Sequence, residues 1–67
     1  MAKFVVYQDG TRQYRWRFRA DNGRIVADSS EGYNNKADCL NGIAIVKREA
    51  PAAPVEDTTV ASAATRY

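Results

Sequence analysis

Residues 13–20 read Gln-Tyr-Arg-Trp-Arg-Phe-Arg-Ala, and two kinds of side chain alternate along this stretch without a break. A period of two is typical of a β-strand that buries one face and exposes the other. We therefore predict a strand with two unlike faces. The aromatic face is made by Tyr14, Trp16, Phe18 and Ala20, and the arginine face by Arg15, Arg17 and Arg19.

The strand is followed by Asn22-Gly23, a strong signal for a two-residue hairpin turn. Residues 24–30 then form the next strand, antiparallel to the first. Counting outward from the turn predicts the opposed pairs Phe18–Ala27, Arg17–Asp28 and Trp16–Ser29. Because directly opposed residues share a face, the aromatic face of this strand contains Ile25, Ala27 and Ser29.

A third strand precedes these two, over residues 3–8, which are rich in β-branched and aromatic side chains. It leads into a hairpin signal at Asp9-Gly10, whose register has two alternatives. A two-residue turn places on the aromatic face Val5 and Tyr7. A three-residue loop with a bulge instead places there Phe4 and Val6. We favour the longer loop, because it brings Phe4 beside Trp16.

The last element is a helix over residues 36–49, with Asn35 as its N-cap and Asp38 completing a variant of the capping box. One stripe of this helix carries Cys39, Ile43, Val46 and Ala50. We expect this stripe to cover the aromatic face and to bury Trp16 and Phe18. The predicted fold is α+β, a three-stranded antiparallel sheet (β-β-β-α) with one helix packed on its aromatic face.

The composition changes after Ala50, where the chain becomes rich in Ala, Pro, Thr and Ser. Such a segment buries too little apolar surface to offset the entropy of ordering it. We therefore predict a domain over residues 1–50 and a disordered tail over residues 51–67. The alternative is a docking peptide that uses Val60 and Tyr67.

Composition excludes several classes of site. The 67 residues contain one cysteine and no histidine, so we expect no disulfide, no metal site, no cofactor and no catalytic residue, and we predict that the protein is not an enzyme. The net charge of +2 implies no particular partner. No apolar run approaches the length of a membrane helix. The start of the chain lacks the long apolar stretch of a signal peptide, and we predict a cytoplasmic protein.

The order of these signals resembles the YegP-like family of small uncharacterised bacterial and archaeal domains. The residues that carry the resemblance run from Tyr14-Arg15-Trp16-Arg17-Phe18 through Asn22-Gly23, Ala27, Ser29-Ser30-Glu31-Gly32-Tyr33, Lys36-Ala37 and Gly42-Ile43 to Val46-Lys47. The family implies a strand-strand-strand-helix unit and brings no activity or catalytic residue. Many members carry two copies of the unit in tandem, and this chain has one.

Two regions contain candidate ligand or phosphate contacts. Arg15, Arg17 and Arg19 follow one another about 7 Å apart along one strand. This spacing suits a nucleic-acid backbone, which makes weak nucleic-acid binding the alternative function. The loop between the last strand and the helix contains Ser29, Ser30 and Glu31. It serves either as a ligand site or as a structural turn, in which Gly32 takes an unusual backbone angle and Glu31 reaches an arginine.

The function we favour is a binding or interaction module that acts as a homodimer with an unknown ligand. A core of about fifty residues is thin for a domain that stands alone, the sheet has open edges, and Ile45 lies off the core stripe as a candidate dimer contact. Relatives with two tandem copies imply that one copy is half of a symmetric unit.

Overall fold

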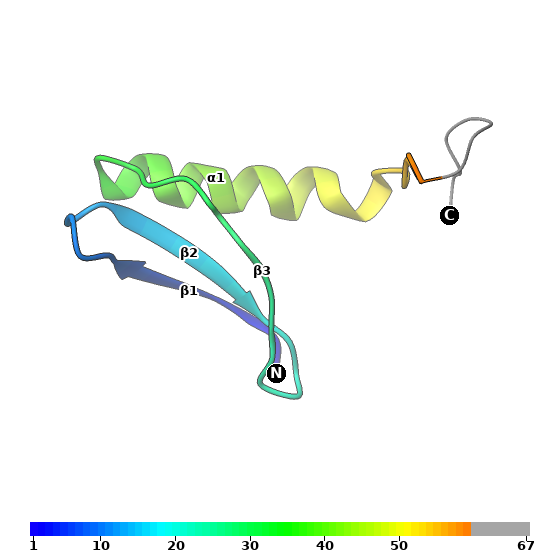
Figure 1. Ribbon diagram of the computed structural model, residues 1–67, viewed down its shortest axis with the longest axis horizontal. Coiled ribbons are helices and arrows are strands. Elements are labelled where there is room, and N and C mark those ends of the chain that lie inside the picture. Colours follow the sequence, from blue (N-terminus) through cyan, green and yellow to red (C-terminus); the bar gives the residue numbers. More distant parts are fainter. Residues whose placement is uncertain (60–67) are drawn as a thin grey trace.

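The computed structural model describes residues 1–59. Three antiparallel strands, β1 (Lys3–Gln8), β2 (Tyr14–Arg19) and β3 (Ile25–Asp28), form a sheet in the order β1-β2-β3. The helix α1 (Lys36–Glu49) lies along one face of this sheet and leads into the short 3₁₀ helix η1 (Ala50–Ala52). Figure 1 shows the sheet and the helix as two layers, and the predicted α+β fold is confirmed. Within residues 1–59 no helix is long and apolar enough to cross a lipid bilayer.

The first hairpin uses the three-residue loop. The backbone of Asp9 closes it by donating to the carbonyl of Gln13 at 3.0 Å, and Arg12 takes the left-handed conformation at φ 67°. Phe4 therefore pairs with Phe18, and Val6 pairs with Trp16. The ring of Phe4 meets that of Trp16 edge-on at 5.4 Å.

The second hairpin keeps the predicted register only in part. Phe18 lies opposite Ala27 and Arg17 opposite Asp28, as predicted. The pairing then shifts, so that Arg19 faces Ile25 instead of Val26. This irregularity moves Ile25 off the predicted aromatic position and leaves it 46% exposed. The prediction was wrong here because the turn is a three-residue loop over residues 21–23 instead of the two residues Asn22-Gly23. The backbone of Ala20 closes this loop by donating to the carbonyl of Arg24 at 2.8 Å, and Gly23 takes the left-handed conformation at φ 85°. The irregularity at Val26 then restores the predicted register further from the turn.

The helix begins and ends where its sequence predicts. The side chain of Asn35 accepts a hydrogen bond from the backbone of Asp38 at 2.9 Å and returns one to the Asp38 carboxylate. Pro51 falls in the first turn of η1, where its missing N–H and fixed φ are tolerated. The predicted boundary after Ala50 and the disorder of the tail remain predictions, and the docking residues Val60 and Tyr67 lie outside the described residues.

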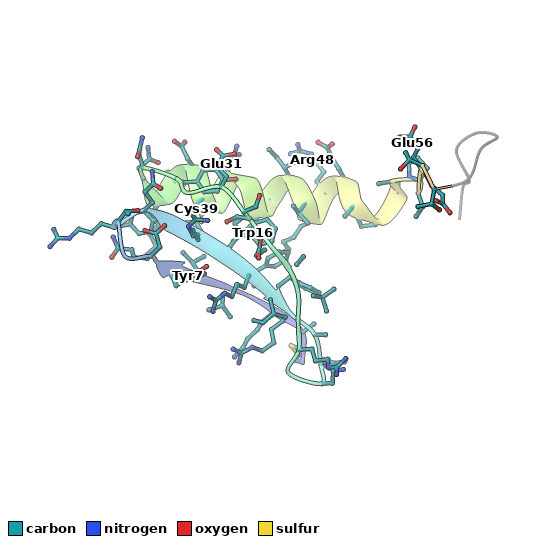
Figure 2. All side chains as sticks on the ribbon, in the orientation of Figure 1. Tyr7, Trp16, Glu31, Cys39, Arg48 and Glu56 are labelled. Carbon is teal, nitrogen blue, oxygen red and sulfur yellow. The ribbon has the colours of Figure 1, made fainter. Side chains whose placement is uncertain are left out.

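The core is centred on the first half of α1. Among the described residues only Trp16, at 7% exposure, and Cys39, at 0%, are buried apolar side chains. Figure 2 shows both between the sheet and the helix. The helix and the strands then diverge towards the second half of α1. Phe18, which we expected to be largely buried under Val46, is therefore only half-buried.

Gly42 lets the helix approach this core closely. A Cβ at this position would lie 2.7 Å from the hydroxyl oxygen of Tyr33 and 3.5 Å from Nε1 of Trp16. The neighbour that requires a glycine at this position of the helix is therefore a tyrosine side chain.

Tyr33 is held in place by the sheet. Its backbone exchanges two 2.8 Å hydrogen bonds with Tyr14, which extends the pairing of β2 beyond β3. The neighbouring Gly32 does not have the unusual backbone angle that we expected. Gly32 instead leaves room for Gln13, because a Cβ at position 32 would lie 3.0 Å from Cβ of Gln13. The residue of this loop with a left-handed backbone conformation is Ser30, at φ 53°.

We predict that Trp16→Ala lowers the free energy of unfolding by roughly 3–5 kcal/mol, because it empties the centre of a core that contains few other buried side chains. Chemical denaturation at one fixed protein concentration measures this. Val26→Ala, at a side chain that is 66% exposed, is the control and should change stability by less than about 0.5 kcal/mol. Equal effects of the two changes would show that Trp16 is not the centre of the core.

We also predict that Gly42→Ala destabilises the domain by about 1 kcal/mol or more, although alanine is the better helix former. The cause is the Tyr33 hydroxyl, so the loss should shrink by about 1 kcal/mol in a Tyr33→Phe background. Gly10→Ala is the control, since nothing lies within 4 Å of a Cβ at that position. Additive effects of the changes at Gly42 and Tyr33 would contradict the contact.

Candidate functional site

The arginine face contains more than the three arginines of β2. Directly opposed residues share a face, and the register pairs Arg15 with Tyr7, Arg17 with Val5, and Arg19 with Lys3. Asp28 joins this face from β3 through its pairing with Arg17. A single aromatic ring of β1, that of Tyr7, is thereby placed among the arginines. The strand alternation of residues 3–8 predicts this composition once the three-residue loop is chosen.

Arg15 is engaged in the structure of the hairpin. Its Nε donates to Oδ2 of Asp9 at 2.6 Å, and its Nη1 donates to the backbone carbonyl of Ser30 at 3.2 Å. The other carboxylate oxygen of Asp9 accepts hydrogen bonds from Thr11 and from the backbone of Gln13. Arg15 therefore connects the β1–β2 turn to the β3–α1 loop.

These contacts favour the charged form of both side chains. The hydrogen bond from Arg15, followed by that from Thr11, holds the pKa of the Asp9 carboxyl well below its usual range. The same bond to Asp9 raises the pKa of Arg15. The pair is charged at any ordinary pH, and the guanidinium group of Arg15 is already bound to a carboxylate.

Arg17 and Asp28 are cross-strand neighbours, as predicted, but they form no ion pair within residues 1–59. The guanidinium carbon of Arg17 lies 4.3 Å from the centre of the Tyr7 ring, a cation–π contact on the diagonal between β2 and β1. Asp28 instead accepts a hydrogen bond from the backbone of Ser30. The aromatic ring thus holds Arg17 without neutralising its charge.

The candidate loop residues are used mainly inside the fold. The Ser29 hydroxyl accepts from the backbone of Trp16 at 3.3 Å and donates to the carbonyl of Glu31 at 3.0 Å. Within the described part of the chain the carboxylate of Glu31 pairs with no arginine, contrary to its expected structural role. Of the six candidate contacts, the structure brings Arg15 to Ser30 and leaves Arg17 and Arg19 elsewhere on the sheet. A ligand at these residues remains a prediction.

The opposite face of the sheet contains an apolar groove of about 440 Å³, which opens where the helix diverges from the strands. It is lined by Phe4, Trp16, Phe18, Ala27, Val46, Lys47, Ala50 and Pro51. Sequence reasoning missed this groove because periodicity identifies the face of a helix but not its angle to a sheet. One signal was present, since after Ile43 the core stripe contains only the small residues Val46 and Ala50.

Two remaining candidates from the sequence lie apart from these surfaces. Cys39 is buried, and burial raises the pKa of its thiol, which disfavours the reactive thiolate. Ile45 is 39% exposed and is not among the residues that line the groove. In the described part of the chain no three metal-ligating side chains of His, Cys, Asp or Glu gather in one place.

The fold recurs in known proteins. The family described as a domain of unknown function (DUF1508) matches residues 9–57. The chain belongs to this family. The DUF1508 match covers the turn with Asp9, the whole of β2 and β3, and all of α1, and it confirms the resemblance to the YegP-like proteins.

Similar proteins come from bacteria and archaea. A UPF0339 protein of Agrobacterium fabrum is 47% identical over 62 residues, which are 92% of this chain and 98% of the relative. A UPF0339 protein of Methanosarcina acetivorans is 47% identical over 55 residues, covering 82% and 93% of the two chains. The NMR solution structure of a protein from Haloferax volcanii superposes with a TM-score of 0.79 at 49% identity, over 85% of this chain and 95% of that one. DUF1508 is described without an activity, so the match assigns no catalytic residue or ligand to this chain.

We predict an acid-sensitive contribution to stability from Asp9. Because its pKa is lower in the folded chain than in the unfolded one, it stabilises the fold at every pH above its ordinary value of about 4. This stabilisation is lost as the pH falls further, towards the folded pKa. Between about pH 6 and pH 2 the free energy of unfolding should therefore fall more steeply with decreasing pH in the wild type than in Asp9→Asn. Chemical denaturation at a series of pH values measures this.

Two further variants separate the ion pair from general charge effects. Arg15→Gln should weaken the dependence of the unfolding free energy on pH as Asp9→Asn does, because it removes the largest cause of the lowered pKa of Asp9. Arg12→Asn removes a positive charge from the same hairpin at a residue that forms no ion pair within residues 1–59, and it should keep the wild-type profile. If the unfolding free energies of the wild type and Asp9→Asn changed with pH in parallel, the Asp9 carboxylate would not be the source of the acid-sensitive stability.

Proposed function

We propose that the protein is a small non-enzymatic binding or interaction module that acts as a homodimer, and that the apolar groove is the dimer contact. The observation that carries this proposal is the groove itself, between the aromatic face and the second half of α1. Phe18 and Val46 line it and are only half-buried, while Ala27, Ala50 and Pro51 are exposed. A surface of this kind marks an interaction site.

The thin core favours a second copy of this chain as the partner that occupies the groove. With two buried apolar side chains among the described residues, the monomer has little to offset the entropy of folding. Small domains compensate with a disulfide, a metal or a partner. This chain has one cysteine and no histidine, so self-association is the means its composition leaves open.

The chemistry of the groove suits a twofold contact. Seven of its eight lining residues are apolar and none is acidic, which fits the depletion of charge at the centre of obligate interfaces. The one cation, Lys47, has a long apolar stem that can lie along the groove while its ammonium group stays in water. The outer edge of β1 also has no neighbouring strand among the described residues, and a partner can cover it. An obligate contact of this kind buries more than about 1,200 Å² in total.

The ligand is left open. The arginine face lies on the opposite side of the sheet from the groove, so we do not place Arg15, Arg17 or Arg19 in the dimer contact. The alternative function, weak nucleic-acid binding by the arginine row of β2, remains a prediction. Arg15 is held by Asp9, whereas Arg17 and Arg19 form no ion pair within residues 1–59.

Sedimentation equilibrium tests the dimer directly. Over about 1 to 100 µM the wild type should sediment at twice the 7.5 kDa of one chain, and its unfolding midpoint should rise with concentration. Ala50→Glu places a charge in the groove at a side chain that is exposed in the monomer. It should give single chains whose free energy of unfolding is lower than that of the wild type and whose unfolding midpoint no longer depends on protein concentration.

Matched variants assign the contact. Ala44→Glu makes the same change on an exposed part of α1 outside the groove and should remain dimeric. Ile45→Ser tests the candidate contact predicted from the sequence, and a dimer formed through the groove should tolerate it. A 7.5 kDa mass at every concentration would end the proposal. Dissociation of Ala44→Glu or Ile45→Ser, with Ala50→Glu still dimeric, would move the contact away from the groove.

A further inference from the structure

One end of the arginine face concentrates positive charge. Lys3 begins β1, and Arg17 and Arg19 lie at the end of β2. All three side chains are exposed. Within residues 1–59 none of them forms an ion pair with a carboxylate. We call these three residues the basic strip.

The arrangement of the strip is unfavourable for the isolated domain. Lys3 and Arg19 are directly opposed across β1 and β2, and like charges in this position destabilise a sheet. The nearby acids have other partners, since Asp21 lies 3.3 Å from the terminal amine and Asp28 accepts from the Ser30 backbone. An anionic partner would relieve the repulsion between the two cations.

The geometry points to a linear polyanion. Arg17 and Arg19 are two residues apart on one strand, so their side chains stand about 7 Å apart on the same face. Tyr7 holds the guanidinium of Arg17 by a cation–π contact, which reduces the entropy lost when a ligand binds that group. Lys3 lies directly opposite Arg19 and widens the row across the sheet.

We propose that the basic strip binds the phosphate backbone of single-stranded nucleic acid without reading its sequence. A flexible single strand can follow a short row of cations on a twisted sheet, whereas a rigid duplex meets only part of it. The single ring on this face, Tyr7, is covered by Arg17 on one side, so base stacking contributes little and charge contributes most. The binding is therefore strongly dependent on salt.

Fluorescence anisotropy with a labelled oligothymidylate of about 15 nucleotides measures this binding. If the three cations of the strip neutralise three phosphates, the affinity of the wild type should fall about 20-fold between about 50 and 200 mM salt. In Lys3→Gln/Arg19→Gln the affinity at low salt should be at least about tenfold weaker, and it should fall only about threefold over the same range of salt. A duplex of the same length should bind more weakly than the single strand.

The control Lys36→Gln/Arg48→Gln removes the same charge from exposed positions on α1 and should bind the oligonucleotide as the wild type does.

A second control, Lys3→Glu, distinguishes a loss of binding from a loss of folding. A carboxylate opposite Arg19 should raise the melting temperature by about 1 to 5 °C while binding is lost.

Three results would overturn the proposal: no binding by the wild type at low salt, equal losses in the strip and control variants, or tighter binding of the duplex. Since the basic strip and the groove lie on opposite faces of the sheet, the proposal of a dimer and the proposal of nucleic-acid binding can each be refuted without affecting the other.

Discussion

The contact between the indole of Trp16 and the first half of α1 at Cys39 and Gly42 is the constraint on which the rest of this structure depends. Among the described residues it is the one place where the helix approaches the sheet closely enough to bury apolar side chains. The approach requires a glycine on the helix, because the Tyr33 side chain occupies the space where a Cβ would be. Beyond this point the two layers separate, and the aromatic face becomes a groove instead of a closed core.

Most of the secondary structure could be predicted from local patterns because it is locally determined. The alternation over residues 13–20 places β2 and its two faces, and the Asn35 cap places the start of α1. The favoured three-residue loop also placed Phe4 beside Trp16 correctly. In each case the residues that decide the conformation lie within a few positions of one another.

Most of the features that escaped prediction are decided by contacts between distant parts of the chain. The register shift at Val26 has a local cause, a loop one residue longer than predicted, but the pair Asn22-Gly23 alone does not distinguish the two loop lengths. The angle of the helix depends on packing that no local pattern encodes. The same holds for the candidate contacts. Charge pattern alone places three arginines in a row, but the assignment of Arg15 to Asp9 and of Arg17 to Tyr7 appears only when β1 is laid beside β2 in register. The three arginines of β2 therefore differ in role: Arg15 is a structural residue, whereas Arg17 and Arg19 are exposed.

The bulge in the second hairpin also makes the two edges of the sheet unequal. β3 has four residues against six in β1, and the register shift interrupts it, which is how soluble proteins discourage a new strand from adding to an edge. Within residues 1–59 the pairing of β1 has no such interruption. Strand addition would therefore proceed from the β1 side only, and two chains that paired through β1 would consume the open edge of both. Growth by strand pairing stops at two chains, so the shape of the sheet itself opposes open-ended polymerisation into fibres.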